Sequence, residues 1–246
     1  MKQTVLVTGS AKGIGREIIT RFAKSGFNCV INYHTSEKQA KELKNELEKL
    51  GADVLLIKAD VSNETQVKEM VSKIVEKYQK IDVLVNNSAV TYDSLFCDKH
   101  QNEFNKVLNT NITGTFLVSK YVGDIMFKNK YGKIINIAST NGINTYYPMC
   151  AEYDASKAGI ISLTHNLAVQ YAPYITVNAV APGFVATEAE IKDMDDEYIK
   201  AETEKIMVRR AGTPSDVAGL VMFLASKQAD FINNTVIRID GGLYGA

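Results

Sequence analysis

The segment Thr8-Gly9-Ser10-Ala11-Lys12-Gly13-Ile14-Gly15 decides the fold, because it joins a β-branched run at residues 4–8 to a helix-like segment at residues 14–27. Glycines in such a turn permit a tight reversal, close approach of the backbone to a pyrophosphate, and close packing of helix on strand. The N-terminus of the helix would offer free N–H groups to phosphates. The spacing is G-x-x-x-G-x-G rather than G-x-G-x-x-G, and a glycine-rich loop without a ligand is the alternative. We predict a dinucleotide site whose turn contributes Gly9, Ser10, Lys12, Gly13, Ile14 and Gly15.

Strand-like and helix-like segments alternate along the whole chain. The β-branched runs lie at residues 4–8, 29–32, 54–57, 83–86, 133–138, 175–180 and 236–239. Helical spacing covers residues 14–27, 37–50, 63–78, 103–127, where a break could occur, and 151–171. Ser36 and Gln39 fit a capping box at the start of the second helix. We therefore predict an α/β fold, with residues 1–246 forming a single doubly wound Rossmann-type domain that has a seven-stranded parallel sheet and helices on both faces.

Composition excludes several classes of protein. The 246 residues carry 28 basic and 28 acidic side chains, whereas a general nucleic-acid binder has a basic excess. No apolar run approaches the ~20 residues of a membrane-spanning helix, and the N-terminal apolar stretch is too short for a signal peptide. The scattered Cys29, Cys97 and Cys150, like the three histidines, predict neither a disulfide framework nor a metal site. We expect a cytoplasmic protein without a nucleic-acid or membrane partner.

The second strand indicates which dinucleotide binds. Sites for NAD have a carboxylate ~20 residues beyond the glycines, which binds the ribose hydroxyls. Here the region reads Asn32-Tyr33-His34, and the first acid, Glu37, falls inside the predicted helix. Lys12 could meet a 2′-phosphate as a point charge, although a solvated surface lysine is the alternative. We predict NADP(H), with Asn32, Tyr33 and His34 as further cofactor-binding residues.

A second group of residues has the chemistry of an acid–base catalyst. Tyr153 and Lys157 stand four residues apart, on one face of a predicted helix. A nearby ammonium would lower the pKa of the tyrosine from its ordinary ~10 and make it a usable acid or base. Ser139 ends a predicted strand, where open α/β sheets bind ligands. A buried tyrosine beside an extended lysine is the alternative for the Tyr–Lys pair alone.

In order and spacing, these residues resemble the short-chain dehydrogenase/reductase family, and within it the bacterial 3-oxoacyl-acyl-carrier-protein reductases. The resemblance spans essentially the whole chain. Besides the glycine turn, Ser139, Tyr153 and Lys157, it rests on Asp60-Val61, Asn86-Asn87-Ser88-Ala89, Asn111, Pro182-Gly183 and Asp240-Gly241-Gly242.

The resemblance implies a role for each catalytic residue. Tyr153 would donate a proton to the substrate carbonyl, which Ser139 would orient. Lys157 would hold the nicotinamide ribose and lower the pKa of the tyrosine. Asn111 would hold a water that joins Lys157 to a proton relay; the alternative is an asparagine that only bonds locally.

The resemblance also implies the rest of the cofactor site. Asp60 and Val61 would flank the adenine, and Asn86, Ser88 and Ala89 would line the path of the ribose. The residues that would lie beside the nicotinamide amide are Pro182, Gly183, Val185 and Thr187. Ser88 and Ala89 replace the usual alanine and glycine, and a serine is small enough to keep the cofactor site intact.

Three departures from the family concern the substrate. Residues 140–152, expected as a substrate wall, are one residue longer than in the carrier-protein reductases. Those reductases dock an acidic carrier protein on cations; Lys130 could be one, but the second position falls at Pro173-Tyr174, where there is no base. A lid is expected at about residues 184–210, and its part from 188 to 205 has eight acids and three bases, a net charge of 3 − 8 = −5. Such a lid would repel an acidic partner, unless it is merely a solvated helix face.

These observations predict an NADP(H)-dependent enzyme that reduces a ketone to a secondary alcohol. A 3-oxoacyl thioester of fatty-acid synthesis is the first choice of substrate, with an acyl carrier protein as one candidate partner. A small free ketone, sugar or polyol is the alternative, and a non-catalytic dinucleotide sensor is an alternative of another class. The resemblance further implies a homotetramer.

Overall fold

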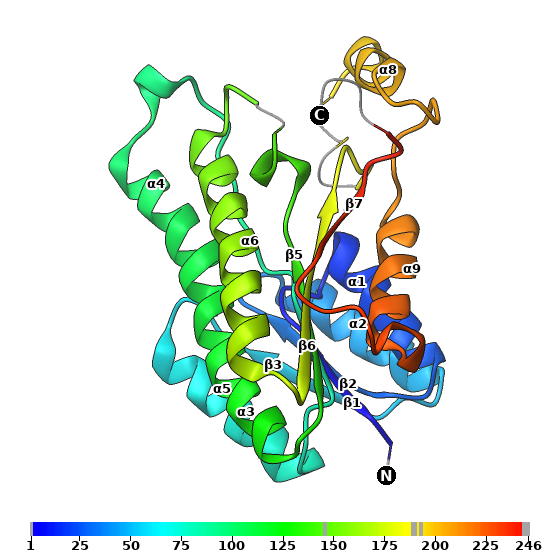
Figure 1. Cartoon of the computed structure of the whole chain (residues 1–246). Coiled ribbons are helices and arrows are strands. Elements are labelled where there is room, and N and C mark those ends of the chain that lie inside the picture. Colours follow the sequence, from blue (N-terminus) through cyan, green and yellow to red (C-terminus); the bar gives the residue numbers. More distant parts are fainter. Residues whose placement is uncertain (1, 145–146, 188–190, 192–193, 243–246) are drawn as a thin grey trace.

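A twisted sheet flanked by helices organises the chain (Figure 1). The computed structural model describes residues 2–144, 147–187, 191 and 194–242. The strands are β1 (Thr4–Val7), β2 (Asn28–Tyr33), β3 (Val54–Lys58), β4 (Val83–Asn86), β5 (Gly132–Ile137), β6 (Ile175–Pro182) and β7 (Val236–Ile239). Their order is β3-β2-β1-β4-β5-β6-β7, and every pairing is parallel. The predicted seven-stranded parallel sheet is confirmed.

Helices cover both faces of this sheet, as predicted for a doubly wound fold. The α-helices of the described chain are α1 (Gly13–Lys24), α2 (Glu37–Lys49), α3 (Glu64–Tyr78), α4 (Gln101–Leu108), α5 (Gly114–Lys128), α6 (Ala151–Tyr171), α8 (Asp196–Glu204) and α9 (Pro214–Ala225). One core cluster joins α1, α2 and α9 to the sheet, and a second joins α3, α5 and α6 to the opposite face (Figure 1). No helix in the described part of the chain has both the length and the apolar character needed to cross a bilayer.

One helix prediction is confirmed, one is wrong, and one helix was missed. The segment at 103–127 does break: a π-helix, Asn109–Thr113, separates α4 from α5. The capping box at Ser36 is wrong, because its ψ of 57° lies outside the extended region and its side chain caps no backbone N–H. Helix α9 was not predicted, although Thr213 and Asp216 form a full capping box around Pro214.

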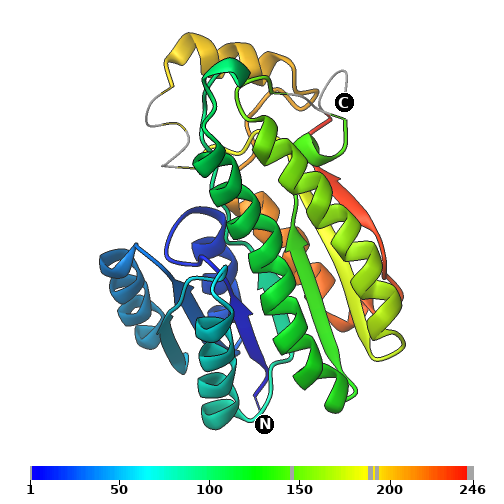
Figure 2. The same ribbon diagram turned by 90° about the vertical axis from the view of Figure 1, so that its left-hand side faces the viewer.

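The strand order places the predicted site segments together. The sheet runs outward in both directions from the neighbouring strands β1 and β4, and ligands bind at the carboxyl end of such a switch point. The glycine turn follows β1, Asn87 follows β4, Ser139 follows β5 and Gly183 follows β6. Figure 2 shows α8, in yellow, standing over this end of the sheet.

Candidate active site

The glycine turn leaves the backbone open to a ligand. Gly9 and Gly13 have φ of 61° and 56°, a region that favours glycine. A Cβ on Gly15 would lie 2.5 Å from Nδ2 of Asn87. That amide donates to the carbonyl oxygens of Thr8 at 2.9 Å and Gly9 at 3.2 Å, and so fixes the turn to the segment after β4.

Side chains of the same turn fit a phosphate-bearing cofactor. The hydroxyl of Ser10 is buried and has no hydrogen-bond partner among the described residues. Lys12 is exposed and directly precedes the first turn of α1. Ile14 is partly buried and packs on the core beneath. An unsatisfied hydroxyl, a free helix N-terminus and an exposed ammonium are the groups that an anion needs.

The three residues predicted at the end of β2 differ in exposure. Oδ1 of Asn32 accepts from the N–H of Gly9 at 3.2 Å, while its Nδ2 donates to Ala59 O at 3.1 Å, so this side chain braces the turn. Tyr33 is buried in the core. Only His34 among the three is exposed, with Nδ1 3.8 Å from a carboxylate oxygen of Asp60.

Asp60 and Val61 follow the carboxyl end of strand β3. Burial raises the pKa of Asp60, but hydrogen bonds from Ser62 and the charges of Lys106 and His34 outweigh it and hold the value below the ordinary range. Val61 is buried, and a Cβ added to Gly114 would lie only 2.6 Å from Cγ2 of Val61. Val61 therefore packs against α5, and Asp60 is the more polar of the two candidates.

Asn86, Ser88 and Ala89 line the chain as it leaves β4. The amide of Asn86 is buried and donates to Ser119 Oγ and Asn136 Oδ1, both at 2.8 Å. The N–H of Ser88 donates to Thr8 Oγ1 at 3.0 Å, whereas Ala89 is exposed. The side chain of Asn86 is thus held inside the protein, while Ala89 lies at its surface.

The predicted Tyr–Lys pair is formed at the start of α6. Lys157 is only 2% exposed, and its Nζ lies 5.2 Å from the ring centroid of Tyr153. The ammonium donates to the carbonyl oxygen of Ile137, the last residue of β5, at 2.7 Å. Burial lowers the pKa of Lys157 to about 7. A buried cation bonded to a neutral carbonyl at a strand end suits recognition of a polar ligand.

Ser139 joins this pair from the end of β5. It is 8% exposed, and its Oγ accepts from the N–H of Asn141 at 3.2 Å. The short helical turn that follows packs against α6, since a Cβ on Gly142 would lie 2.5 Å from the backbone of Lys157. The structure therefore brings Ser139, Tyr153 and Lys157 to one place.

Asn111 belongs to the π-helix between α4 and α5 and is fully buried. Its Oδ1 accepts from the N–H of Val90 at 2.9 Å. Its Nδ2 donates to Val90 O at 3.0 Å and to Ser156 Oγ at 2.9 Å. These contacts connect the segment after β4 to α6, and the water relay assigned to Asn111 stays a prediction.

The segment after β6 passes close to the glycine turn. Pro182 ends β6, and Gly183 donates to Ile239 O at 3.2 Å. Val185 is buried and bridges to Gly212. A Cβ on Gly13 would lie 3.8 Å from Thr187 Cγ2, so Thr187 lies beside the turn; its contact with the nicotinamide amide stays a prediction.

The predicted wall and lid are described in part. Residues 145–146 of the wall, and 188–190 and 192–193 of the lid, lie outside the described residues. Tyr198 of α8 hydrogen-bonds Tyr147; burial, Glu202 and this bond raise the pKa of Tyr198 to about 12. Lid and wall therefore touch. Burial and Asp154 raise the pKa of the Cys150 thiol to about 12, which makes it a poor nucleophile.

Sequence reasoning missed one pair of residues beside Tyr153. The ammonium of Lys99 lies 2.7 Å from Oε2 of Glu152, and both side chains are buried. The two residues are far apart in the sequence and follow no motif, so only the folded chain shows that they meet.

Comparison with known proteins fits this geometry. The family model described as enoyl-(acyl carrier protein) reductase matches residues 9–244. The chain belongs to the short-chain dehydrogenase/reductase family. A 3-oxoacyl-acyl-carrier-protein reductase of Staphylococcus epidermidis is 38% identical, over 99% of this chain and all of that protein. Glucose 1-dehydrogenase 2 of Bacillus subtilis is 34% identical, over 98% of this chain and 94% of that protein.

Solved structures agree with this assignment. The structure of ElxO with NADP bound has a TM-score of 0.89 and 36% identity, covering 98% of both chains. A 3-oxoacyl-acyl-carrier-protein reductase from Brucella melitensis has a TM-score of 0.91 and 30% identity, covering 99% of this chain and 92% of that one. This short-chain dehydrogenase/reductase is therefore an oxidoreductase, and its relatives act on more than one class of substrate.

Proposed function

We propose that this enzyme uses NADP(H) to reduce a ketone to a secondary alcohol, with a 3-oxoacyl thioester as the favoured substrate. One observation carries the proposal. The buried Lys157 donates to the Ile137 carbonyl oxygen at 2.7 Å, and its ammonium lies 5.2 Å from the centroid of the Tyr153 ring at the ligand-binding end of the sheet. A non-catalytic sensor has no chemical need for such a pair.

Each residue of the site has a separate task. When bound, the nicotinamide supplies the hydride. Tyr153 donates the proton to the carbonyl oxygen, and Ser139 holds that oxygen by a hydrogen bond. Lys157 binds ribose hydroxyls and favours loss of the tyrosine proton, and Asn111 completes the relay that restores it.

The choice of NADP(H) rests on charge around the cofactor site. Lys12 offers an exposed ammonium beside the glycine turn, and His34 is exposed after β2, where sites for NAD have a carboxylate. A lysine acts as a point charge toward a phosphate. The buried hydroxyl of Ser10 would donate to the phosphates.

The thioester is favoured by the relatives that reduce one, but charges near the site disfavour an acidic carrier. Lys130 lies two residues before β5, and its Nζ is 5.9 Å from the centroid of the Tyr174 ring. It is therefore at the opposite end of the sheet from Tyr153 of the same chain. Within α8, Asp196 and Glu197 lie in the first turn. We infer that a free or coenzyme-A-linked ketone serves at least as well as a carrier-linked one.

We also propose that the enzyme is a homotetramer. Large apolar side chains are exposed on helices that cover the sheet, including Phe116 of α5, Val169 of α6 and Phe223 of α9, with Phe231 beyond α9. Surfaces of this kind mark contacts with other subunits. Light scattering should give about four times 27.1 kDa; a mass near 27.1 kDa would contradict the tetramer.

A substrate panel tests the proposed reaction. Oxidation of NADPH and of NADH is measured with 3-oxoacyl thioesters, diketones and sugars, and the alcohol product is identified. We expect the thioesters to be reduced fastest. Efficient oxidation of glucose with little thioester reduction would favour the sugar dehydrogenase instead, the function suggested by the Bacillus subtilis relative.

A further inference from the structure

One buried ammonium ties three segments together next to Tyr153. The side chains of Lys99 and Glu152 are 7% and 1% exposed. Nζ of Lys99 lies 2.9 Å from Oε1 and 2.7 Å from Oε2 of the glutamate. The same nitrogen donates to Tyr92 O at 3.0 Å, Ser94 Oγ at 3.3 Å and Met149 O at 2.9 Å. The segment after β4, the substrate wall and the first turn of α6 therefore meet at Lys99.

Helix geometry relates this contact to the proposed proton donor. Residues four apart share a helix face, so Glu152 and Ser156 lie on one face of α6, and Tyr153 and Lys157 on the neighbouring one. Glu152 is held by Lys99, and Ser156 is held by Asn111 at 2.9 Å. These two contacts, together with the packing of α6 on β6 and on the turn after β5, set how far the helix is rotated about its axis. The direction in which Tyr153 points follows from that rotation.

Packing stability alone does not account for this pair. Removing two charges from water is costly, and a buried ion pair often stabilises a protein no more than apolar residues of the same volume. A second buried lysine, Lys133, is matched to a carboxylate of Asp230 that is 60% exposed. Lys99 and Glu152 are both buried, and Glu152 immediately precedes Tyr153 in the sequence.

We propose that Lys99 and Glu152 form a positioning pair that orients Tyr153 and whose own two charges cancel beside it. The inference rests on the proposed function, in which Tyr153 donates the proton. Neither residue is assigned to the reaction itself. Other charged groups near this turn of α6 are Lys157 on the same helix, Asp154, and Asp93 of the segment after β4.

Substituting one residue of the pair should shift the pH profile in the opposite direction to substituting the other. Glu152→Gln keeps the shape but leaves the ammonium of Lys99 uncompensated, which favours ionised Tyr153. Lys99→Met leaves the carboxylate uncompensated, which disfavours it. The alkaline fall in the rate of ketone reduction should therefore move to lower pH in the first variant and to higher pH in the second, by about one pH unit each. General damage to the fold would not produce shifts of opposite sign.

The experiment compares wild type, E152Q, K99M and the double variant K99M/E152Q. It measures kcat/KM for NADPH-dependent reduction from pH 6 to 10, with whichever ketone the wild type reduces. We expect the double variant to regain the wild-type pH profile, and kcat of K99M to fall about tenfold while KM for NADPH stays within about twofold. Lys133→Met is the matched control, because it removes a buried paired lysine at the other end of β5 and should leave the profile unchanged.

An unshifted profile in E152Q, or shifts of the same sign in both single variants, would overturn the positioning pair. If K99M does not fold, E152Q and the double variant decide the question. A Tyr153→Phe variant separates the two proposals. Activity retained by it would refute the role of Tyr153 in the proposed function, whereas an inactive Y153F with an unshifted E152Q refutes the pair alone.

Discussion

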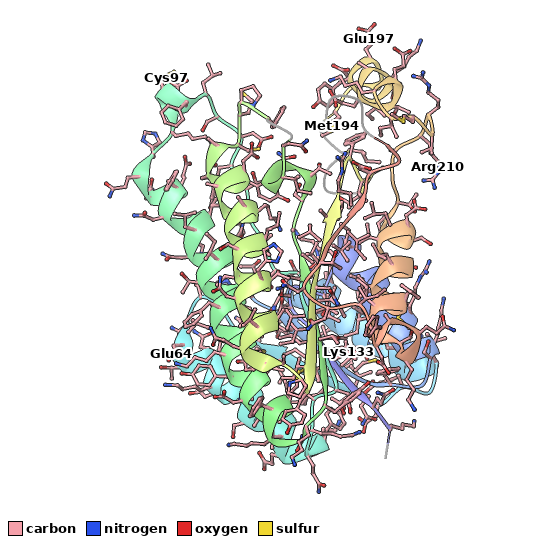
Figure 3. The ribbon with its side chains drawn as sticks, viewed as in Figure 1. Glu64, Cys97, Lys133, Met194, Glu197 and Arg210 are labelled. Carbon is pink, nitrogen blue, oxygen red and sulfur yellow. The ribbon has the colours of Figure 1, made fainter. Side chains whose placement is uncertain are left out.

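Two buried lysines at opposite ends of the sheet, Lys133 and Lys157, differ in how their charge is compensated. At the amino end, Lys133 lies 2.7 Å from Asp230, and Asp82 accepts from the N–H of Thr4 at 2.7 Å and from Lys80 at 3.0 Å. At the carboxyl end, the Lys157 ammonium donates to the neutral carbonyl oxygen of Ile137 at 2.7 Å. Figure 3 shows Lys133 in the lower half of the molecule, far below Cys97 and Glu197 at the top.

This difference separates stability from function. A buried charge with an ionic partner is largely compensated within the fold, whereas a buried lysine without one is destabilising and readily loses its proton. Burial accordingly lowers the pKa of Lys157 to about 7. Such perturbed groups concentrate at functional sites, so Lys157 carries a cost in stability that the ion-paired Lys133 does not.

The largest expected effect is on Tyr153. Tyr153→Phe keeps the ring but removes the proton donor, so turnover should fall by ~10²–10⁴-fold while NADPH affinity stays close to the wild-type value. Steady-state assays and a fluorescence titration with NADPH measure the two quantities. The control is Tyr171→Phe at the far end of the same helix, whose hydroxyl donates to Ser119 O at 3.3 Å. More than a few per cent residual activity in Y153F would show that another group supplies the proton.

The second prediction concerns the effect of buried Lys157 on how stability depends on pH. Because the pKa of Lys157 lies below that of an unfolded lysine, the unfolded chain binds more protons above pH 7, and stability should rise with pH from this residue. Between pH 7 and 8.5, the free energy of unfolding of the wild type should therefore increase by about 1–2 kcal/mol more than that of the Lys157→Met variant. Urea denaturation of the cofactor-free enzyme at both pH values measures this difference.

Lys133→Met provides the contrast. It should keep full activity, because Lys133 lies at the amino end, whereas Lys157→Met should lose both turnover and NADPH affinity. If the free energy of unfolding changed equally with pH in the wild type and in K157M, burial would not have lowered the pKa of Lys157. Loss of activity in K133M would contradict the separation of the two ends.

A smaller effect is expected at the cofactor's phosphate. The wild type should prefer NADPH over NADH at least tenfold in kcat/KM, about 1.4 kcal/mol. Lys12→Ala should reduce this preference several-fold, since its ammonium is the exposed cation of the glycine turn. Lys24→Ala, at the other end of α1, should leave it unchanged. Equal or reversed preference in the wild type would refute the assignment of NADPH.

The smallest effect concerns the outer surface of the carboxyl end. If the acidic lid repels an acidic carrier, a 3-oxoacyl group on coenzyme A should be reduced at least as fast as one on an acyl carrier protein. Salt should raise the carrier-linked rate, because charges are screened beyond ~8–10 Å at physiological ionic strength. A strong preference for the carrier that fades with salt would instead indicate a basic docking surface.

The sequence determined the fold and supplied the residues proposed for the site. Strand and helix periods, with the glycine turn, predicted the order of elements and the parallel sheet, because those signals depend on neighbouring residues. The spacing of Tyr153 and Lys157 was sufficient to place both on one helix face. A local signal also marked α9, since Thr213, Pro214 and Asp216 form its cap, and it was overlooked.

Tertiary structure alone decided how the predicted residues divide their work. Asn32 and Asn86, expected at the cofactor, turn their amides to the protein backbone and to buried side chains. Lys99 meets Glu152, 53 positions away, because the segment after β4 and the first turn of α6 reach the same end of the sheet. Local sequence sets periodicity and turn chemistry, whereas burial and charge pairing depend on which distant segments pack together, and only the folded chain specifies that.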